Sequence, residues 1–372
     1  MKQWKVGVVG CGNIAETVYL PQMKQLENVT LTAVCDLSLE RAEYIAEKFD
    51  AAGWYDDADL FLREADVEIV MSLGAIQGRH ELNMKILNAG KHLYTQKPFA
   101  ATVKEATAQI EAAREKNVVL STAPVHRNRP DIRWTKQLLD ENLIGHVSLV
   151  KIDVSHGGPE YFQYRDSDPS WFYRKGAGSL MDIGIHGIDQ MVALLGAAKY
   201  VSCMAAVSEP VRTVRTGKYD GKTIQADELY DNYIISLDFG GGTLGLVTSG
   251  FVQKASANPE VGIEIYGSEG TLVVGGGVAF SGIAEVKAFV DKPEIGLRGW
   301  IKPLPLKEAP QTEYFQCQCL SDLIEAAEGG RLSRLSPEHS RHVIEILEAI
   351  PEAIRTGGKV ALKTTIYPNG TP

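Results

Sequence analysis

A short apolar run near the start of the chain constrains the fold most. Residues 5–9 are rich in valine and glycine, too apolar for a surface segment and too short for a helix, which predicts a buried parallel strand. Gly10, Gly12 and Ala15 follow in the spacing Gly-x-Gly-x-x-Ala. The first glycine allows a tight turn, the second lets the backbone approach a pyrophosphate, and the alanine lets a helix pack close to the strand. The free N–H groups at the start of that helix can bind phosphate.

The glycine spacing alone is weak evidence for a dinucleotide site, because a chain with 36 glycines forms such spacings by chance. The residues around it make the evidence stronger. A second β-like run, residues 29–35, leads directly into Asp36. That position suits the carboxylate that binds the adenosine ribose in a dinucleotide site. We therefore predict a dinucleotide site rather than a turn without a ligand. Asp36 favours NAD because its charge would repel a 2′-phosphate, whereas Arg41 leaves NADP as an alternative.

Strands and helices continue to alternate after Asp36. Strand-like runs at 67–73, 92–95 and 118–121 are separated by helical segments, which predicts βαβ units and a parallel sheet. Ligands of such sheets bind beyond the carboxyl ends of the strands. Lys97 lies in one of these loops, where its ammonium group could stabilise a developing alkoxide. Its position alone also fits a solvated surface lysine.

The length and charge of the chain limit its class. A chain of 372 residues with 44% hydrophobic residues suggests two domains with substantial cores. The net charge of −9 argues against nucleic acid and anionic membranes as partners, and no apolar run is long enough to span a bilayer. The first strand begins at once, which leaves no room for a signal peptide, and the five scattered cysteines suggest reduced thiols. We therefore expect a cytoplasmic protein.

One helix in the second half carries a polar stripe. Residues 179–195 predict a helix with Ser179 as its N-cap. Asp182, His186 and Asp189 share one face of it, while the residues between them are mostly apolar. A polar stripe on a buried helix must be paired or must face a cleft, so it indicates either a satisfied His–Asp pair or a catalytic group. The cluster has too few ligands for a catalytic zinc site, and no metal is predicted.

An aromatic loop precedes this helix, with His156, Tyr161, Tyr164, Trp171 and Tyr173. Flat apolar faces beside a few polar groups suit a sugar pocket, and ordinary packing is the alternative.

The remainder of the chain predicts a sheet and two late helices. Alternating residues within 201–274 indicate a mostly antiparallel sheet, and 212–222 indicate a basic, solvated loop. Helices are expected at 312–328 and 337–356.

Two motifs resemble those of the glucose–fructose oxidoreductase / inositol dehydrogenase / MocA (Gfo/Idh/MocA) family. Residues 89–98 read Ala-Gly-Lys-His-Leu-Tyr-Thr-Gln-Lys-Pro and resemble the family pattern Ala-Gly-Lys-His-Val-x-x-Glu-Lys-Pro, with Gln96 in place of the glutamate. Residues 176–189 are similar to Gly-Gly-Gly-x-Leu-x-Asp-x-Gly-x-His-x-x-Asp. The loop at 74–80 departs from the family's Thr-Pro-x-x-x-His but keeps His80.

This resemblance implies a fold and a reaction. The implied fold is α/β, with a Rossmann dinucleotide-binding domain over 1–122 and an α+β domain over 123–372, whose large, mostly antiparallel open sheet would form a homodimer or homotetramer. The implied reaction is hydride transfer between a secondary alcohol of a sugar, polyol or inositol-like substrate and NAD or NADP. Lys97, Asp182 and His186 would be the catalytic set.

The expected contacts form two sets. Those for the cofactor are Gly10, Gly12, Asn13, Ile14, Asp36, Arg41, Leu73, Gly74, His80, Gln96 and Lys97. Those for the substrate are Lys97, His126, Tyr161, Trp171, Asp182, His186 and Asp189.

The resemblance also implies a role for each catalytic residue. His186 would take the proton from the substrate hydroxyl, Asp182 would orient that hydroxyl or the imidazole, and Lys97 would stabilise the alkoxide. Glutamine at position 96 keeps hydrogen-bonding capacity but lacks the charge of glutamate. Two other functions remain alternatives: a non-catalytic regulator that binds dinucleotide and sugar, and a glycosidase that uses NAD for transient oxidation.

Overall fold

The computed structural model describes residues 2–162, 167–258, 262–275, 283–303, 314–329 and 331–366. The chain forms two compact units. The first contains Met1–Asn128, Phe315–Ile344 and Ile366–Pro372, and the second contains Arg129–Tyr314 and Glu345–Thr365. The sequence analysis divides the chain after residue 122 into a cofactor-binding part and a substrate-binding part. That assignment of roles stays a prediction.

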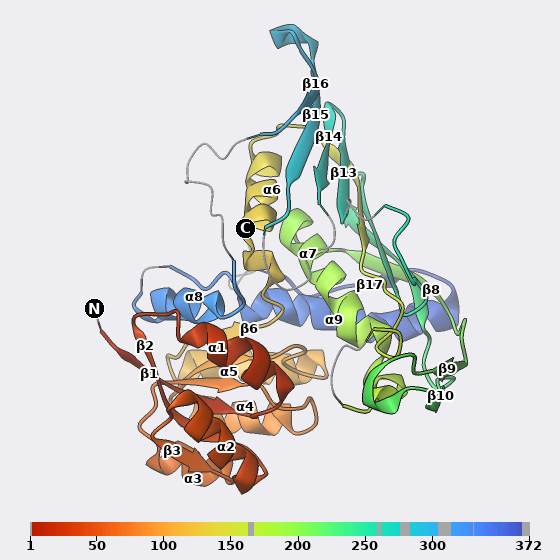
Figure 1. Cartoon of the computed structure of the whole chain (residues 1–372). Helices are drawn as coiled ribbons and strands as arrows, with labels where there is room; N and C mark the ends of the chain where they lie inside the picture. Colours follow the sequence, from red (N-terminus) through yellow and green to blue (C-terminus); the bar gives the residue numbers. More distant parts are fainter. Residues whose placement is uncertain are drawn as a thin grey trace. The chain divides into compact units, whose positions relative to one another are not determined.

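The first unit is built on a six-stranded parallel sheet (Figure 1), which confirms the predicted α/β fold. The strand order is β3-β2-β1-β4-β5-β6. The strands are β1 (Trp4–Val9), β2 (Val29–Cys35), β3 (Gly53–Tyr55), β4 (Ile69–Ser72), β5 (His92–Thr95) and β6 (Leu120–Thr122). All four residues of β4 are buried, as expected for a strand with helices on both faces of its sheet.

Helices connect these strands and cover the sheet. They are the π-helical segment η1 (Ala15–Tyr19), α1 (Leu20–Met23), α2 (Leu39–Phe49), α3 (Ala58–Glu64), α4 (Arg79–Asn88), α5 (Val103–Glu115) and the short η2 (His126–Asn128). Phe61 of α3 lies so close to β1 that a Cβ at Gly7 would meet its ring at 2.5 Å. The late helix α8 (Gln318–Ala327) packs beside β5 and β6, which explains why Phe315–Ile344 belongs to this unit.

The second unit contains a nine-stranded sheet in the order β16-β15-β14-β13-β7-β12-β11-β8-β17. Only β7 and β12 run parallel, and the other described pairs are antiparallel, so the predicted mostly antiparallel sheet is confirmed. The strands are β7 (Val147–Asp153), β8 (Tyr200–Ala206), β11 (Asn232–Gly240), β12 (Thr243–Gly250), β13 (Ile263–Gly267), β14 (Gly270–Val274), β15 (Val286–Lys292), β16 (Leu297–Ile301) and β17 (Val360–Ala361). The predicted start of the helix at 312 lies outside the described residues.

Helices cover one face of this sheet (Figure 1). They include α6 (Pro130–Asp140), the π-helical segment η4 (Leu180–Gly184) and α7 (Ile185–Leu195), which continues η4. Among the shorter helical elements are η3 (Pro169–Tyr173), η5 (Gly217–Tyr219) and η6 (Pro293–Ile295), and the last helix is α9 (Pro337–Thr356).

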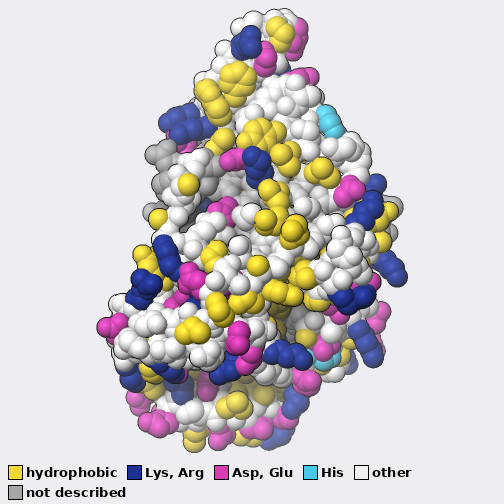
Figure 2. All heavy atoms as spheres, turned by 90° about the vertical axis from the view of Figure 1, so that its right-hand side faces the viewer, with side chains coloured by type: hydrophobic (Ala, Val, Ile, Leu, Met, Phe, Trp, Pro, Cys, Tyr) yellow, Lys and Arg dark blue, Asp and Glu magenta, His cyan; other side chains and the backbone are white. Residues whose placement is uncertain are grey.

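The opposite face of the nine-stranded sheet exposes large side chains, and hydrophobic groups gather on it in Figure 2. Met204 of β8 lies directly opposite Ile234 of β11, with 75% and 49% of their surfaces exposed.

The prediction of a solvated loop at 212–222 is wrong at its first residue. Arg212 is only 2% exposed and lies in β9 (Val211–Thr213), which pairs with β10 (Thr223–Gln225). The charge of this arginine is balanced inside the protein, as described below.

No helix among the described residues combines the length and the apolar character that a membrane crossing requires.

Candidate functional site

The glycine turn after β1 is closed against the loop that follows β4. Gly10 has a positive φ of 96°, and a Cβ there would lie 2.3 Å from the backbone nitrogen of Gly74. Only glycine fits this position, because both the backbone conformation and the close approach exclude a side chain. A Cβ at Gly12 would meet nothing within 4 Å, so the backbone at Gly12 is bare on that side. This is the arrangement that a pyrophosphate requires.

Asp36 and Arg41 hold this turn from two sides. The Asp36 carboxylate accepts hydrogen bonds from the backbone nitrogens of Cys11 at 2.8 Å and Ser38 at 3.1 Å. The Nε of Arg41 donates to the carbonyl oxygen of Cys11 at 2.7 Å. A carboxylate has about four acceptor positions, so Asp36 can accept further hydrogen bonds, and its contact with a ribose stays a prediction.

Asn13 and Ile14 lead from this turn into the helix that follows. Asn13 is exposed and Ile14 is half-buried. The first helical turns, η1, are π-helical rather than α-helical. π-Helical segments are rare and are often found at functional sites.

A buried arginine joins the loops after β4 and β5. Arg79 is 6% exposed, and its guanidinium donates to the carbonyl oxygens of Gly74 at 2.5 Å and Pro98 at 2.6 Å. Burial lowers the pKa of Arg79 to about 10, and the arginine forms no ion pair with any described residue. Arg79 was not among the predicted site residues, and its only signal in the sequence is its place in the loop that departs from the family pattern.

His80 turns toward the interior of the first unit. Its Nδ1 lies 3.2 Å from the Nε2 of Gln109, a fully buried residue of α5. The same amide donates to the carbonyl oxygen of Phe99 at 3.1 Å and accepts from Asn83 at 2.8 Å. His80 therefore belongs to a polar network between α4 and α5, and its contact with the cofactor stays a prediction.

Gln96 fixes the backbone of Lys97. Its Oε1 accepts from the Lys97 backbone nitrogen at 2.9 Å, and its Nε2 donates to the hydroxyl of Tyr19 at 2.9 Å. Tyr19 and Tyr94 share a hydrogen bond of 2.7 Å between their hydroxyls. Lys97 is half-buried, and its peptide bond to Pro98 is cis. Gln96 thus supports the lysine through neutral hydrogen bonds alone.

The remaining cofactor and substrate candidates of the first unit are buried. Leu73 is 4% exposed at the end of β4, and its backbone nitrogen donates to the carbonyl oxygen of Val9. His126 is 6% exposed in η2.

The polar stripe of the second unit begins on a π-helical segment. Asp182 lies in η4, and His186 and Asp189 lie in α7. Asp182 and His186 are half-buried, whereas Asp189 is fully buried. The prediction that Ser179 caps this helix is wrong: its side chain makes no capping bond, because the chain at this residue is already helical (φ −60°, ψ −35°).

His156 lies within the electrostatic reach of Asp182. Its Nδ1 accepts a hydrogen bond from the Gly158 backbone nitrogen at 2.9 Å, and its ring stacks on Phe251 with centroids 5.0 Å apart. Burial lowers the pKa of His156, and the negative charges of Asp182 and Glu160 partly oppose this shift. Burial therefore favours the neutral form of His156, and the bond from Gly158 occupies Nδ1 as an acceptor.

The aromatic loop divides into exposed and packed rings. Trp171 is 44% exposed and stacks on Phe172 with centroids 3.7 Å apart. Tyr161 is half-buried and packs against Gly157 and the edge of Phe162. Trp171 thus keeps an exposed ring surface, and its contact with a sugar stays a prediction. Tyr164 lies outside the described residues.

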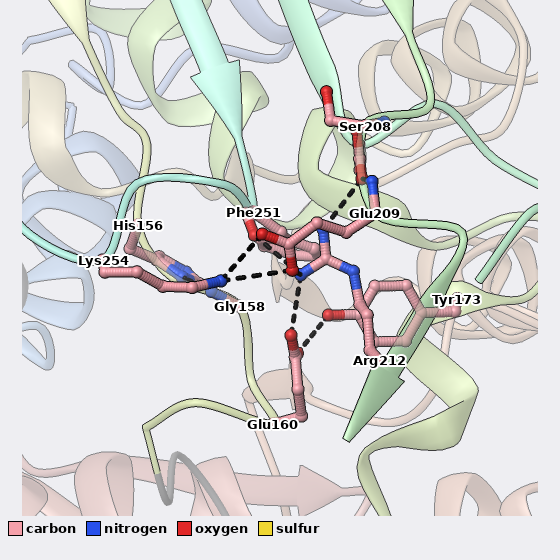
Figure 3. Close-up of polar contacts among 10 residues, drawn as sticks. His156, Gly158, Glu160, Tyr173, Ser208, Glu209, Arg212, Phe251 and Lys254 are labelled. Carbon is pink, nitrogen blue, oxygen red and sulfur yellow. Dashed lines mark hydrogen bonds and ion pairs between the residues drawn. The ribbon is translucent and has the colours of Figure 1, made fainter. Parts of the chain in front are cut away.

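A buried charge cluster supports this loop (Figure 3). Arg212 donates to Glu160 at 2.7 Å, to the carbonyl oxygen of Phe251 at 2.7 Å and to Asp231 at 2.8 Å. The hydroxyl of Tyr173 donates to the other oxygen of Glu160. Burial alone would lower the pKa of Arg212, but its interactions with Tyr173, Glu160 and Asp231 hold it above the usual range.

The candidate residues are thus divided between the units. Lys97 and His126 lie in the first unit, and Tyr161, Trp171, Asp182, His186 and Asp189 lie in the second. That Lys97 and His186 meet over one nicotinamide ring stays a prediction. Within the described part of the chain, no three His, Cys, Asp or Glu side chains are arranged to hold a metal ion.

Two family descriptions match most of the chain. Residues 4–123 match "Oxidoreductase family, NAD-binding Rossmann fold". Residues 132–273 match "GFO/IDH/MocA C-terminal domain".

Individual proteins are similar at low identity. D-glucoside 3-dehydrogenase of Escherichia coli (strain K12) is 27% identical over 255 residues, which cover 66% of this chain and 70% of that protein. Myo-inositol 2-dehydrogenase of Thermotoga maritima is 23% identical over 273 residues, which cover 72% of this chain and 74% of that protein. The crystal structure of an NAD binding oxidoreductase from Klebsiella pneumoniae superposes with a TM-score of 0.82 at 20% identity, covering 97% of this chain and 100% of that one. With its Rossmann unit, its mixed nine-stranded sheet and both family matches, the chain belongs to the Gfo/Idh/MocA family of oxidoreductases.

Proposed function

We propose that the protein is an NAD-dependent dehydrogenase that transfers hydride between a secondary alcohol of a sugar, polyol or inositol-like substrate and nicotinamide. The observation that carries the proposal is the glycine turn, closed on Gly74 and bonded to the carboxylate of Asp36. Such a turn binds dinucleotides, and the similar D-glucoside and myo-inositol dehydrogenases point to polyhydroxylated substrates.

The residues of the first unit fit the cofactor. The bare backbone at Gly12 and the start of the following helix, with Asn13 and Ile14, would bind the pyrophosphate. Asp36 would accept the ribose hydroxyls, and its charge would disfavour a 2′-phosphate. Leu73, Gly74, His80 and Gln96 lie in or beside the loops after β4 and β5, where the nicotinamide end would bind.

The chemical step would use three side chains. The bound nicotinamide supplies the hydride acceptor or donor. His186 would hold the proton of the reacting hydroxyl at its imidazole, Asp182 would orient that hydroxyl or the imidazole, and Lys97 would stabilise the negative charge that develops on oxygen. Asp189 would support this group from the next helical turn.

The substrate pocket would combine a stacking face with polar groups. Trp171 offers an exposed ring for the apolar face of a sugar, and Tyr161 and His126 would add hydrogen bonds. His156, within reach of the charge of Asp182, is a further candidate for this pocket.

The exposed sheet face supports a homodimer or homotetramer. Met204 and Ile234 form a cross-strand apolar pair, and large exposed apolar patches mark protein interfaces. We also propose a cytoplasmic location, since all five cysteines are free and buried thiols.

A regulator without activity is the second candidate, and Gln96 favours it. An amide supports Lys97 without the negative charge that the family's glutamate would place beside the ammonium group. A regulator would bind NADH and sugars without turnover.

The test is to incubate the purified protein with NAD or NADP and a panel of sugars, inositols and sugar acids, following absorbance of the reduced cofactor. Net NADH formation is expected. Cleavage of glycosides without net NADH would indicate a glycosidase, and cofactor binding without either reaction would indicate a regulator.

Lys97→Ala and His186→Ala should each lower kcat by about 10²- to 10⁴-fold, because each removes a group that acts on the reacting hydroxyl. NADH affinity, measured by fluorescence titration, should stay within about twofold of wild type. Lys104→Ala and His146→Ala, at exposed positions, are matched controls. Wild-type kcat in either active-site variant would refute the role of that residue.

A further inference from the structure

Glu16 lies between two cations at the rim of the glycine turn. One carboxylate oxygen pairs with the guanidinium of Arg41, and the other pairs with the Nζ of Lys48 at 2.5 Å. The hydroxyl of Tyr44 donates to the same oxygen as Lys48, at 3.2 Å. The Glu16 side chain is 19% exposed, against 32% for Arg41 and 43% for Lys48. The carboxylate is therefore the most enclosed member of the group, and it engages both cations at once.

The contacts of Arg41 place this cation beside the proposed ribose site, because Arg41 and Asp36 bond to the same residue. Asp36 accepts from the backbone nitrogen of Cys11, and Arg41 donates to the carbonyl oxygen of that same residue. The two side chains thus bind one residue of the glycine turn from its two ends. A phosphate on the 2′-oxygen of a ribose held by Asp36 would lie within the field of Arg41.

Arg41 has the chemistry to bind such a phosphate. A guanidinium offers a planar fork of N–H donors that matches phosphate oxygens. In this protein, however, Nε is bonded to Cys11 and one terminal nitrogen is paired with Glu16. Phosphate would have to compete with a carboxylate that is already in place.

Glu16 stays ionised throughout the physiological range. Hydrogen bonds from Lys48 and Arg41 lower its pKa to about 2. Since the pKa of Glu16 is depressed in the folded state, the stability that these ion pairs contribute is fully present above about pH 4.5 and is lost as the pH falls toward 2.

We propose that Glu16 determines cofactor specificity by occupying Arg41 and Lys48, so that neither cation is available to the 2′-phosphate of NADP. This inference rests on the proposed dinucleotide function and extends it to a residue outside the ribose contact. Asp36 repels the phosphate directly, and Glu16 removes the cations that would offset that repulsion.

The experiment measures Kd for NADH and NADPH by fluorescence titration of wild type and Glu16→Gln. Glutamine keeps the size of the side chain and removes its charge, which releases both cations. Because ion pairs near the protein surface are worth up to about 1 kcal/mol, the affinity for NADPH should rise about fivefold, while that for NADH should stay within about twofold. The gain should shrink in high salt, since the released charges are then screened.

Two further variants serve as controls. Glu68→Gln removes the same charge from a carboxylate that pairs with Lys2 at 2.7 Å and directly precedes β4, at the amino end of the sheet. It should change neither affinity by more than about twofold. Adding Arg41→Gln to Glu16→Gln should abolish most of the gain in NADPH affinity, because the released guanidinium is then absent.

The outcomes separate this inference from the proposed function. NADH binding to wild type, with no rise in NADPH affinity in Glu16→Gln, would overturn the role of Glu16 and leave the proposed function standing. Equal wild-type affinities for NADH and NADPH would also overturn it. A wild-type protein that binds neither dinucleotide would refute the proposed function itself, and this inference with it.

Discussion

Each unit of the molecule contains buried arginines, and two of them, Arg79 and Arg212, are held in different ways. Arg79 in the first unit donates to the carbonyl oxygens of two loops and has no carboxylate partner among the described residues. Arg212 in the second unit lies between the carboxylates of Glu160 and Asp231. Burial lowers the pKa of Arg79 to about 10, whereas the partners of Arg212 hold its pKa above the usual range.

The two arginines differ in the groups that would lose their hydrogen-bond donor if the arginine were removed. Loss of Arg79 exposes two neutral acceptors in loops that lie at the edge of a sheet. Loss of Arg212 leaves two anions inside the protein without a counter-charge, which is far more costly. A buried arginine is therefore only as important to stability as the charges that depend on it.

The largest effect is expected for Arg212→Met, which keeps much of the side-chain volume. Because Glu160 and Asp231 are 3% and 2% exposed, the free energy of unfolding should fall by about 3–5 kcal/mol in urea denaturation followed by circular dichroism. Arg215→Met, at an exposed position nearby, should cost less than about 0.5 kcal/mol. A loss below about 1 kcal/mol for Arg212→Met would show that the two carboxylates do not depend on it.

A smaller effect is expected for Arg79→Met. Two carbonyl groups lose their donor, but no ion is stranded, so the free energy of unfolding should fall by about 1–2 kcal/mol in the same assay. Arg63→Met on the exposed side of α3 is the matched control. A loss equal to that of Arg212→Met would break the comparison, because it would mean that carbonyl dipoles hold Arg79 as firmly as carboxylates hold Arg212.

The smallest effect concerns pH and His156, which lies beside the Arg212 cluster (Figure 3). Burial lowers the pKa of His156 in the folded state, whereas in the unfolded chain the pKa of this histidine is near 6.5. Below about pH 6.5 the unfolded chain therefore binds more protons than the folded protein. Stability should therefore fall as the pH decreases below about 6.5, and His156→Gln should remove part of that fall. Thermal unfolding between pH 6.5 and 5 measures it, with exposed His146→Gln as control. An unchanged pH profile in His156→Gln would contradict the assigned cause.

Local patterns made much of the fold predictable. Alternating strands and helices predict the parallel sheet, and the spacing of Gly10 and Gly12 predicts the turn, because both depend on residues that are neighbours in sequence. The short strand β3 was not predicted, since three residues carry too little pattern. Strands β15 and β16 were not predicted either.

The supporting contacts of the candidate site could not be predicted, because their partners lie far apart in sequence. Arg79 and Pro98 are 19 residues apart, and Arg212 and Glu160 are 52 apart. The sequence of 212–222, which is basic and contains glycines, is typical of a solvated loop. Only the tertiary structure places the carboxylates of Glu160 and Asp231 beside Arg212. Burial of Arg212 is thus a property of the tertiary structure and has no local signal.

The π-helical segment η4 has a consequence for the register of the polar stripe. A π-turn holds one more residue than an α-turn, so the helix accommodates an insertion between Leu180 and Gly184. Deleting Ile183 would restore regular α-helical spacing and would place Asp182 three residues from His186 instead of four, which changes the angle between their side chains around the helix axis. The widened turn therefore sets the angular relation between the carboxylate and the imidazole, and a single-residue deletion would change that relation.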